Sequence, residues 1–232
     1  MYGGIALNIC IIPARGGSKR IPKKNIKIFC GKPLIEYSIE NAEKSELFDR
    51  IVVSTDSKEI AEVSEKCGAE ILWRPKELAD DYSGSIDVFE HAIKILNKEN
   101  KYHYACMLYP TAPLLDIKYL KEGIEQLKIS DACYSFSATT YDFPIWRSFE
   151  IVNGKAKMFF PEYMNKRSQD LKEAYHDAGQ FYWKNLKCND KFHFNGSIPI
   201  IIPRYLTQDI DTLEDFIKAE LMYKALNDYI KS

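Results

Sequence analysis

A glycine-rich and strongly cationic segment follows the first apolar run of the chain. It reads Pro13-Ala14-Arg15-Gly16-Gly17-Ser18-Lys19-Arg20, and Lys24 and Asn25 come shortly after it. Adjacent glycines let backbone N–H groups approach an anion, while the lysines and arginines neutralise several negative charges. The segment has neither G-x-x-x-x-G-K nor G-x-G-x-x-G spacing. It therefore predicts a different kind of anion-binding loop, suited to a triphosphate, in preference to a tight turn with solvated lysines.

Two carboxylates near the end of the chain, Asp209 and Asp211, are separated by a single residue. In extended backbone, side chains at this spacing point to the same side. Together they suit Mg²⁺, which prefers hard oxygen ligands and takes the rest of its shell from phosphate and water. Asp211 and Glu214 also have the spacing of a capping box, so helix capping is the alternative interpretation.

The elements that position these residues follow from the alternation of short apolar runs with segments of helical periodicity. Strands are predicted at about 5–12, 51–53, 70–72 and 104–109, and helices at about 34–46, 57–67, 86–98 and 117–128. Asp56 and Glu59 have capping-box spacing at the start of the second helix. This alternation predicts a mostly parallel sheet covered on both faces. Ligands of such sheets bind beyond the carboxyl ends of the strands, where the cationic loop would lie.

The periodicity stops between about 137 and 191, where aromatics, prolines and polar turns accumulate. A strand at about 198–202 and a helix at about 213–230 resume it. We therefore expect one domain over residues 1–232 with an inserted arm or lid at about 137–191. The apolar residues of this arm are too many for a solvated loop, so a homodimer in which the arm crosses to a neighbour is predicted.

Composition excludes several classes of protein. The 232 residues are 46% hydrophobic and 28% charged with a net charge of -1, which is typical of a globular protein. The balanced charge disfavours binding to nucleic acid or to a membrane surface. No apolar run reaches the ~20 residues of a membrane helix, and no signal peptide is recognisable. The six cysteines are scattered, which predicts neither a zinc site nor a disulfide framework and indicates a cytoplasmic protein.

Several short motifs, taken in chain order, resemble those of the CMP-sugar synthetases, the cytidylyltransferases that activate sialic acids and other nonulosonic acids. The resemblance runs from about Cys10 to Ile217. It implies a Rossmann-like three-layer α/β/α fold with a mostly parallel sheet and an inserted dimerisation arm. The motifs are Ile12–Lys19, Ser54-Thr55-Asp56, Arg74-Pro75 with Glu77-Leu78-Ala79-Asp80-Asp81, Pro110–Leu114 and Asp209–Thr212.

The resemblance also implies roles for individual residues. The nucleotide would be held by Ala14, Arg15, Gly16, Gly17, Ser18, Lys19, Asn25, Arg74 and Ser85. The catalytic residues would be Lys19, Arg15, Lys24 and Asp211, with Mg²⁺ on Asp209 and Asp211. The sugar would be bound by Tyr109, Thr111, Arg167, Gln180 and Tyr182. His176 is a further candidate for contact with the sugar. Three ordinary explanations stay open: a surface ion pair for Arg74, a helix N-cap for Ser85 and a simple loop histidine for His176.

The implied reaction joins CTP to a nine-carbon 2-keto sugar acid, giving a CMP-sugar for glycan biosynthesis and pyrophosphate. The anomeric hydroxyl would attack the α-phosphorus in line, with catalysis mainly through positioning and charge stabilisation. The hydroxyl proton has two candidate acceptors, Asp211 and a metal-bound water.

The sugar preference is indicated by departures from the sialic acid pattern. The chain has Tyr109, Ala112, Leu115 and Ala178-Gly179 where that pattern has other residues, and Arg20 where the family has glycine. Residues 109–113 and 177–182 resemble the branch that acts on pseudaminic acid. A sialic or legionaminic acid synthetase is the alternative, and Gly16–Lys19 differs from the loop of the related Kdo enzymes. A non-catalytic nucleotide-binding regulatory protein is disfavoured by the carboxylate pair.

Overall fold

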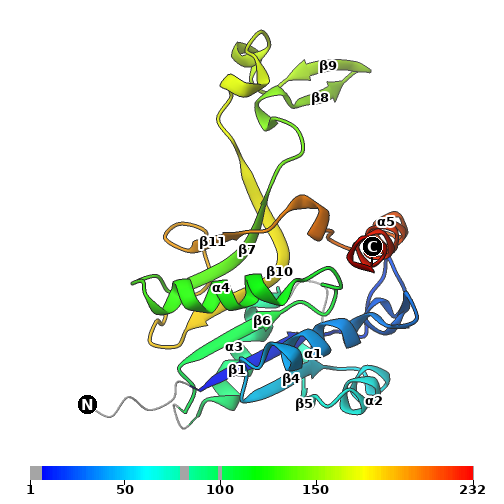
Figure 1. Cartoon of the computed structure of the whole chain (residues 1–232), viewed down its shortest axis with the longest axis vertical. Helices are drawn as coiled ribbons and strands as arrows, with labels where there is room; N and C mark the ends of the chain where they lie inside the picture. The colour runs from blue at the N-terminus through cyan, green and yellow to red at the C-terminus, as the bar shows by residue number, and fades with distance from the viewer. Residues whose placement is uncertain (1–6, 79–83, 99–100, 232) are drawn as a thin grey trace.

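A seven-stranded sheet forms the centre of the computed structural model, which describes residues 7–78, 84–98 and 101–231 (Figure 1). The strand order is β11-β7-β10-β6-β1-β4-β5. All neighbouring pairs are parallel except the two that β10 makes with β6 and β7. The strands are β1 Asn8–Pro13, β4 Arg50–Thr55, β5 Glu70–Trp73, β6 Tyr104–Leu108, β7 Tyr134–Thr140, β10 Tyr175–Asn185 and β11 Ile198–Ile201.

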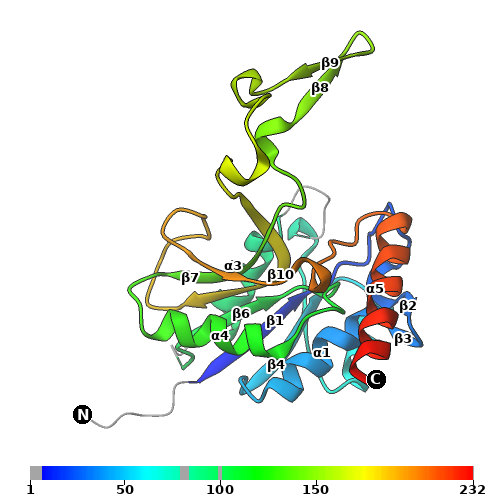
Figure 2. The same cartoon turned by 45° about the horizontal axis from the view of Figure 1, so that its top comes forward.

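Helices cover both faces of this sheet, so the predicted three-layer α/β/α fold is confirmed (Figure 2). One face carries α1 (Leu34–Ser45), α2 (Lys58–Lys66) and α4 (Ile117–Lys128), and the other carries α3 (Ser85–Leu96). The last helix, α5 (Leu213–Lys231), packs instead against the hairpin of β2 (Ile28–Phe29) and β3 (Lys32–Pro33). Single 3-10 turns lie at Lys24–Ile26, Lys76–Leu78, Ile145–Arg147, Pro161–Tyr163, Ser168–Asp170 and Arg204–Leu206.

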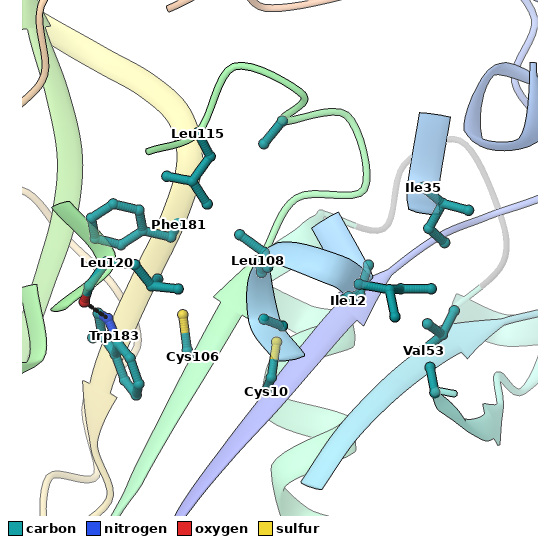
Figure 3. Packing of buried hydrophobic residues seen from close by; sticks show 14 of the residues in the cluster. Cys10, Ile12, Ile35, Val53, Cys106, Leu108, Leu115, Leu120, Phe181 and Trp183 are labelled. Carbon is teal, nitrogen blue, oxygen red and sulfur yellow. Dashed lines mark hydrogen bonds between the residues drawn. The ribbon is translucent and has the colours of Figure 1, made fainter. Parts of the chain in front are cut away.

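The core explains why the central strands have continuous apolar sequences. In β1, residues 9–12 are all at most 1% exposed, because both faces of a central parallel strand are covered. Ile12 packs with Ile35 of α1 and Val53 of β4 in the larger cluster (Figure 3). At the other end of that cluster, Trp183 is fully buried and donates from Nε1 to the Leu120 carbonyl over 3.0 Å.

The projecting arm is shorter than the sequence predicted. Residues 134–140 and 175–185 belong to the central sheet as β7 and β10, so only residues 141–174 leave it. The far end of this arm is the hairpin of β8 (Phe149–Val152) and β9 (Lys155–Met158), well away from the sheet (Figure 1). The sequence did not predict β10 because buried polar side chains interrupt the apolar pattern of this strand. Lys184 is one of them, and its ammonium group pairs with Glu90 over 2.5 Å.

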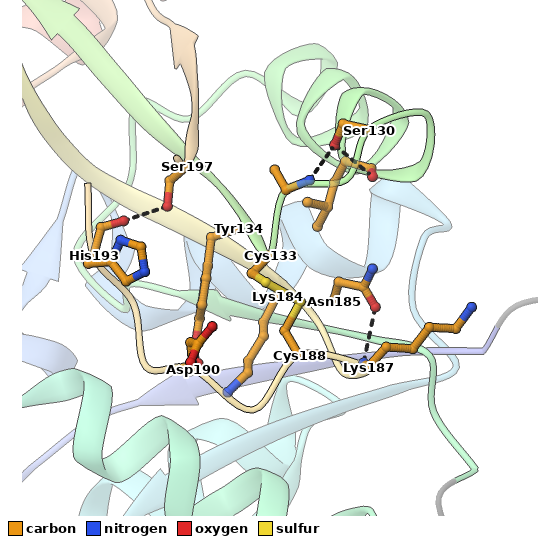
Figure 4. Close-up of a disulfide and its surroundings, with 12 residues drawn as sticks. Ser130, Cys133, Tyr134, Lys184, Asn185, Lys187, Cys188, Asp190, His193 and Ser197 are labelled. Carbon is orange, nitrogen blue, oxygen red and sulfur yellow. Dashed lines mark hydrogen bonds between the residues drawn. A yellow bond between two sulfur atoms is a disulfide. The ribbon is translucent and has the colours of Figure 1, made fainter. Parts of the chain in front are cut away.

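The cysteine prediction is also wrong at one pair. Cys133 and Cys188 form a disulfide with their Cα atoms 5.7 Å apart (Figure 4). Cys133 precedes β7 and Cys188 follows β10, and the antiparallel pairing of Tyr134 with Lys184 brings them together. Since the two cysteines are 55 positions apart, no local pattern indicates the bond. The remaining four cysteines are free.

No helix among the described residues has both the length and the apolar character needed to cross a membrane.

Candidate active site

A pocket of about 450 Å³ opens beside the carboxyl ends of β1 and β6, where ligands of parallel sheets bind. Its wall consists of side chains from the first half of the chain and of Asp211, which precedes α5. The described lining residues are Pro13, Arg15, Ser18, Lys19, Arg20, Lys24, Asn25, Arg74, Ser85, Val88, Tyr109, Pro110, Thr111 and Asp211.

The cationic loop begins where β1 ends, and its backbone is held against the neighbouring strand. The Ala14 N–H donates to the Ser54 carbonyl over 2.9 Å, and the Gly16 N–H donates to Asp56 Oδ1 over 2.8 Å. A Cβ atom at position 16 would come within 2.9 Å of the Ser57 Cβ, so only glycine fits there. Ala14, Gly16 and Gly17 therefore shape the loop, although the described pocket lining does not include them.

Asp56 has a different role from the one its spacing suggested. The N-cap of α2 is Ser57, whose side chain accepts from the Ile60 N–H. Asp56 instead accepts the Gly16 N–H. The capping box predicted for Asp56 and Glu59 is therefore wrong, and Asp56 supports the loop through a contact that only the sheet pairing of β1 with β4 creates.

Asn25 supports the same loop from its other side. Its side chain is 5% exposed and donates from Nδ2 to the Arg15 carbonyl over 3.0 Å. Arg15, Ser18 and Lys19 then face the pocket. Nothing lies within 4 Å of a Cβ built on Gly17, so the space around this residue is open.

Two further cations are anchored by the segment before α5. Lys24 donates from Nζ to the Ile210 carbonyl over 2.5 Å and lies 3.4 Å from Asp211 Oδ1. Arg20 pairs with the same carboxylate oxygen over 2.8 Å. The sequence placed Arg20 in the cationic loop, but it did not indicate the contact with Asp211, which joins residues 191 positions apart.

The carboxylates Asp209 and Asp211 flank Ile210, which is fully buried in the cluster beneath α5. Burial, and then the charge of Asp211, raise the pKa of Asp209. Asp209 keeps an exposed surface and, unlike Asp211, lies outside the described pocket lining; a nearby cation would relieve its repulsion by that like charge. No group of three or more possible metal-ligating side chains occurs among the described residues, so two carboxylates are the donors that the protein offers here.

The helix-capping alternative for Asp211 is wrong. The start of α5 is capped by Thr212 and Asp215: the Asp215 carboxylate accepts the Thr212 N–H over 2.8 Å, and the Asp215 N–H donates to Thr212 Oγ1. The capping pair is thus displaced by one residue from the predicted Asp211 and Glu214. Asp211 remains at the pocket wall.

Arg74 and Ser85 lie on the side of the pocket that faces α3. Arg74 is 9% exposed, donates to the Ser54 carbonyl over 3.0 Å, and has a buried Nε without a described hydrogen-bond partner. Burial lowers its pKa, while the charge of Asp56 opposes this shift and that of Arg15 adds to it. The surface ion pair considered for Arg74 is therefore wrong. Ser85 is not the N-cap either, since Gly84 holds that position.

The predicted sugar-binding residues differ in how they meet the pocket. Tyr109 and Thr111 line the pocket, whereas Gln180 and Tyr182 are 3% exposed and lie behind its described lining. Gln180 donates from Nε2 to the Leu206 carbonyl over 2.6 Å. Arg167 lies in the projecting arm, paired with Asp170 over 2.8 Å.

Three further positions considered for the sugar lie outside the described pocket lining. Ala112 and Ala178 are 3% and 2% exposed, respectively. His176 belongs to β10, contacts the Tyr141 ring at a tilt and is exposed, so it is not a loop histidine. Residues 79–81 of the Glu77–Asp81 motif lie outside the described residues.

A parallel-centred sheet with a cationic pocket at its carboxyl edge defines the class of nucleotide-binding α/β proteins. The family model described as cytidylyltransferase matches residues 9–224, and the chain belongs to this family. It is accordingly a nucleotidyltransferase enzyme.

Relatives and solved structures agree with this assignment. The chain is 47% identical over 223 residues to a pseudaminic acid cytidylyltransferase of Campylobacter jejuni, covering 94% of this chain and 96% of the relative. It is 32% identical to an N-acylneuraminate cytidylyltransferase of Escherichia coli, covering 90% of this chain and 50% of the relative. The fold matches a CMP:2-keto-3-deoxy-manno-octonic acid synthetase complexed with CTP at a TM-score of 0.71, with 12% identity and coverage of 95% and 99%.

Proposed function

We propose that this enzyme joins CTP to pseudaminic acid, giving CMP-pseudaminic acid and pyrophosphate. The observation that carries the proposal is the 47% identity, over nearly the whole of both chains, to a relative of that name. The pocket supports it chemically, because Arg15, Lys19 and Lys24 line one cavity and suit a ligand with several negative charges.

In the proposed mechanism, the chain acts by binding, orienting and neutralising. Arg15, Lys19 and Lys24 hold the phosphates, and Arg74 and Ser85 face the nucleoside. The anomeric hydroxyl oxygen of the sugar acid forms a bond to the α-phosphorus while the bond from that phosphorus to the bridging oxygen breaks. Pyrophosphate leaves with the electron pair of that bond, and the cations stabilise the charge that develops on the phosphate oxygens.

The hydroxyl proton must leave during this step. Asp211 is the only carboxylate among the described residues of the pocket wall, but its Oδ1 is paired with Arg20 and lies near Lys24. These two contacts engage the oxygen that would have to take the proton. We therefore assign the proton to water and assign Asp211 to the metal.

Mg²⁺ is part of the proposal, with Asp209 and Asp211 as its protein ligands. The donor set fits, since both groups are hard oxygen ligands and Asp211 lies at the pocket wall, with the exposed Asp209 two residues before it and outside the described lining. Bound there, the ion would supply charge neutralisation at the phosphate oxygens. In the described residues no third acidic or imidazole group joins the pair, so phosphate and water oxygens would complete the shell.

We also propose a homodimer in which the arm of residues 141–174 reaches a second copy. Several arm side chains are strongly exposed and apolar, among them Phe143 at 82%, Ile151 at 74% and Met164 at 66%. Exposed apolar patches of this kind mark interfaces. Arg167 sits on this arm, so a crossing arm would be its route to a sugar acid. Light scattering tests the proposal: a mass of twice 26.9 kDa is expected, and a monomer at micromolar concentration would contradict it.

The cytoplasm is the proposed location, because nucleoside triphosphates are available there. In a reducing cytosol the Cys133–Cys188 pair is held as thiols unless it is protected from reduction.

The decisive experiment incubates the protein with CTP, Mg²⁺ and a panel of nonulosonic acids while pyrophosphate release is followed. Pseudaminic acid should give the highest kcat/KM, ahead of N-acetylneuraminic and legionaminic acids. Equal values for pseudaminic and N-acetylneuraminic acids would contradict the substrate assignment. Absence of pyrophosphate with every sugar acid would contradict the proposed reaction itself.

A further inference from the structure

The cationic loop is attached to the end of β4 by two hydrogen bonds of different kinds. The Ala14 N–H donates to the Ser54 carbonyl over 2.9 Å, so this bond depends on main-chain atoms alone. The Gly16 N–H donates to Asp56 Oδ1 over 2.8 Å, so this bond depends on a side chain. Asp56 directly follows the last residue of β4 and lies outside the described pocket lining. Its carboxylate therefore acts on the pocket through the loop.

The part of the loop that this carboxylate holds needs an anchor. Gly16 and Gly17 are adjacent, and glycine loses more backbone freedom on folding than any other residue. No described atom lies within 4 Å of a Cβ built on Gly17, so packing does not restrain that residue. Arg15 and Lys19, which line the pocket, lie on either side of the two glycines. The positions of both cations relative to a ligand therefore depend on the bonds that hold the glycines.

A carboxylate has two opposed effects on a loop that binds phosphates. The negative charge of Asp56 repels a polyanionic ligand, but Asp56 is exposed, and the high dielectric constant of the solvent weakens that repulsion. The hydrogen bond to the Gly16 N–H is direct, and a carboxylate acceptor makes it one of the stronger kinds of hydrogen bond. We therefore expect the gain from a fixed loop to outweigh the cost of the added charge.

We propose that Asp56 is a positioning residue for CTP, which fixes the Gly16 N–H and thereby holds Arg15 and Lys19 in the arrangement that binds the triphosphate. The inference rests on the proposed function, since it takes CTP as the ligand of the loop. Asp56 itself makes no contact with the substrate in this role. Loss of the anchor should weaken CTP binding, although it removes a negative charge from the neighbourhood of the phosphates.

Two substitutions at position 56 separate the effect of position from the effect of charge. Asp56→Ala removes both the acceptor and the charge, whereas Asp56→Asn removes the charge but keeps an oxygen for the Gly16 N–H. The measurement is the dissociation constant of CTP, by calorimetry without sugar acid so that no turnover occurs. It should rise about tenfold or more in Asp56→Ala, because binding groups that are misplaced lose much of their effect.

The asparagine variant should behave differently. In Asp56→Asn the dissociation constant of CTP should stay within about threefold of the unmodified value, because the hydrogen bond that holds the loop is kept. If Asp56 acted through its charge alone, both variants would bind CTP more tightly than the unmodified enzyme, since each removes a negative charge. The two roles therefore predict changes of opposite sign for Asp56→Ala.

Asp49→Ala is the matched control. Asp49 is also exposed, and its Oδ2 accepts the Asn8 N–H over 2.7 Å, at the opposite end of β1 from the cationic loop. This substitution removes the same kind of bond away from the pocket. Asp49→Ala should lower Tm about as much as Asp56→Ala does, but it should leave the dissociation constant of CTP unchanged.

Gly16→Ala tests the same contact from the side of the loop. A Cβ atom at this position would come within 2.9 Å of the Ser57 Cβ, so the loop must shift away from the end of β4. This variant should therefore weaken CTP binding as Asp56→Ala does. Because both substitutions release one contact, the Gly16→Ala/Asp56→Ala double variant should lose much less affinity than the product of the two single effects.

Thermal denaturation verifies that each variant is folded. The inference is overturned if Asp56→Ala binds CTP within about twofold of the unmodified enzyme, if Asp56→Asn loses as much affinity as Asp56→Ala, or if Asp49→Ala weakens CTP binding equally. Should Asp56→Ala fail to fold, Gly16→Ala decides by the same measurement and the same twofold limit. Failure of the unmodified enzyme to bind CTP would instead contradict the proposed function.

Discussion

Replacement of Asp211 by asparagine tests the site most directly, because the structure predicts a small effect on stability and a large effect on activity. Asp211 bonds to Arg20 over 2.8 Å and lies 3.4 Å from Lys24, with side-chain exposures of 39%, 65% and 19% for the three residues. Ion pairs exposed to this degree contribute about 0–1 kcal/mol to stability. For a chain of this length, that corresponds to a fall in Tm of less than about 4 °C.

The expected loss of activity is much larger. If Asp211 holds a divalent cation against the phosphates, its removal should lower kcat by about 10²–10³-fold, the scale of one preorganised electrostatic contact. The KM for CTP should not rise, because the substitution removes a negative charge from a pocket that contains Arg20 and Lys24. A large loss in kcat with a small change in Tm is thus the signature of a metal ligand.

The assay measures pyrophosphate release at saturating CTP and sugar acid over a series of Mg²⁺ concentrations, alongside thermal unfolding. Glu214→Gln is the matched control, since it neutralises a nearby exposed carboxylate that takes no part in the Thr212–Asp215 cap. It should leave kcat and Tm unchanged. Near-normal kcat for Asp211→Asn at saturating Mg²⁺ would refute the metal assignment.

Four other predictions follow from single contacts. Lys19→Ala should lower kcat/KM by about two orders of magnitude. Lys23→Ala is the control and should not lower it, because the Lys23 ammonium pairs with Glu59 outside the described pocket lining. Equal effects of the two variants on pyrophosphate release would contradict the placement of Lys19 in the site. Tyr109→Gln should erode the preference for pseudaminic over N-acetylneuraminic acid, measured as a ratio of kcat/KM, with the KM for CTP little changed. Cys188→Ser should lower the free energy of unfolding by about 2–4 kcal/mol in non-reducing urea titrations, and excess dithiothreitol should abolish this difference. The hydrogen bonds from Lys32 and then Lys44 lower the pKa of Glu40 below its ordinary value. The contribution of Glu40 to stability is therefore present above the unfolded-state pKa and is lost as pH falls through the folded-state pKa. Glu40→Gln should make the free energy of unfolding fall less steeply in this acidic range, and an unchanged pH dependence would contradict the assignment.

Local patterns were sufficient for most of the layered architecture. The run of apolar residues in β1 and the helical spacing of Ile35, Ile39 and Ala42 in α1 follow from burial against neighbours one layer away. The cationic loop was also recognisable, because a strand, two glycines and several cations occur within a few consecutive residues. Each of these signals depends on adjacent positions in the chain.

Local spacing did not predict which residue caps a helix, because two neighbouring polar residues both fitted the capping pattern. Asp56 and Asp211 both have capping-box spacing, yet Ser57 and Thr212 cap the helices. The backbone path decides which of two neighbouring polar residues reaches the helix terminus, and one residue of displacement releases the other for a different contact. Asp56 is thereby free to hold Gly16.

The remaining features arise only when distant segments meet. The Cys133–Cys188 disulfide and the Lys184–Glu90 pair both depend on β10 lying antiparallel between β6 and β7. The cationic loop could be recognised from the sequence alone, since its glycines and cations follow one another directly, as the proposed phosphate binding requires. The contacts of Arg20 with Asp211 and of Ser85 with Tyr109 were decided by the tertiary structure, because the order of the strands sets the distances between residues far apart in sequence.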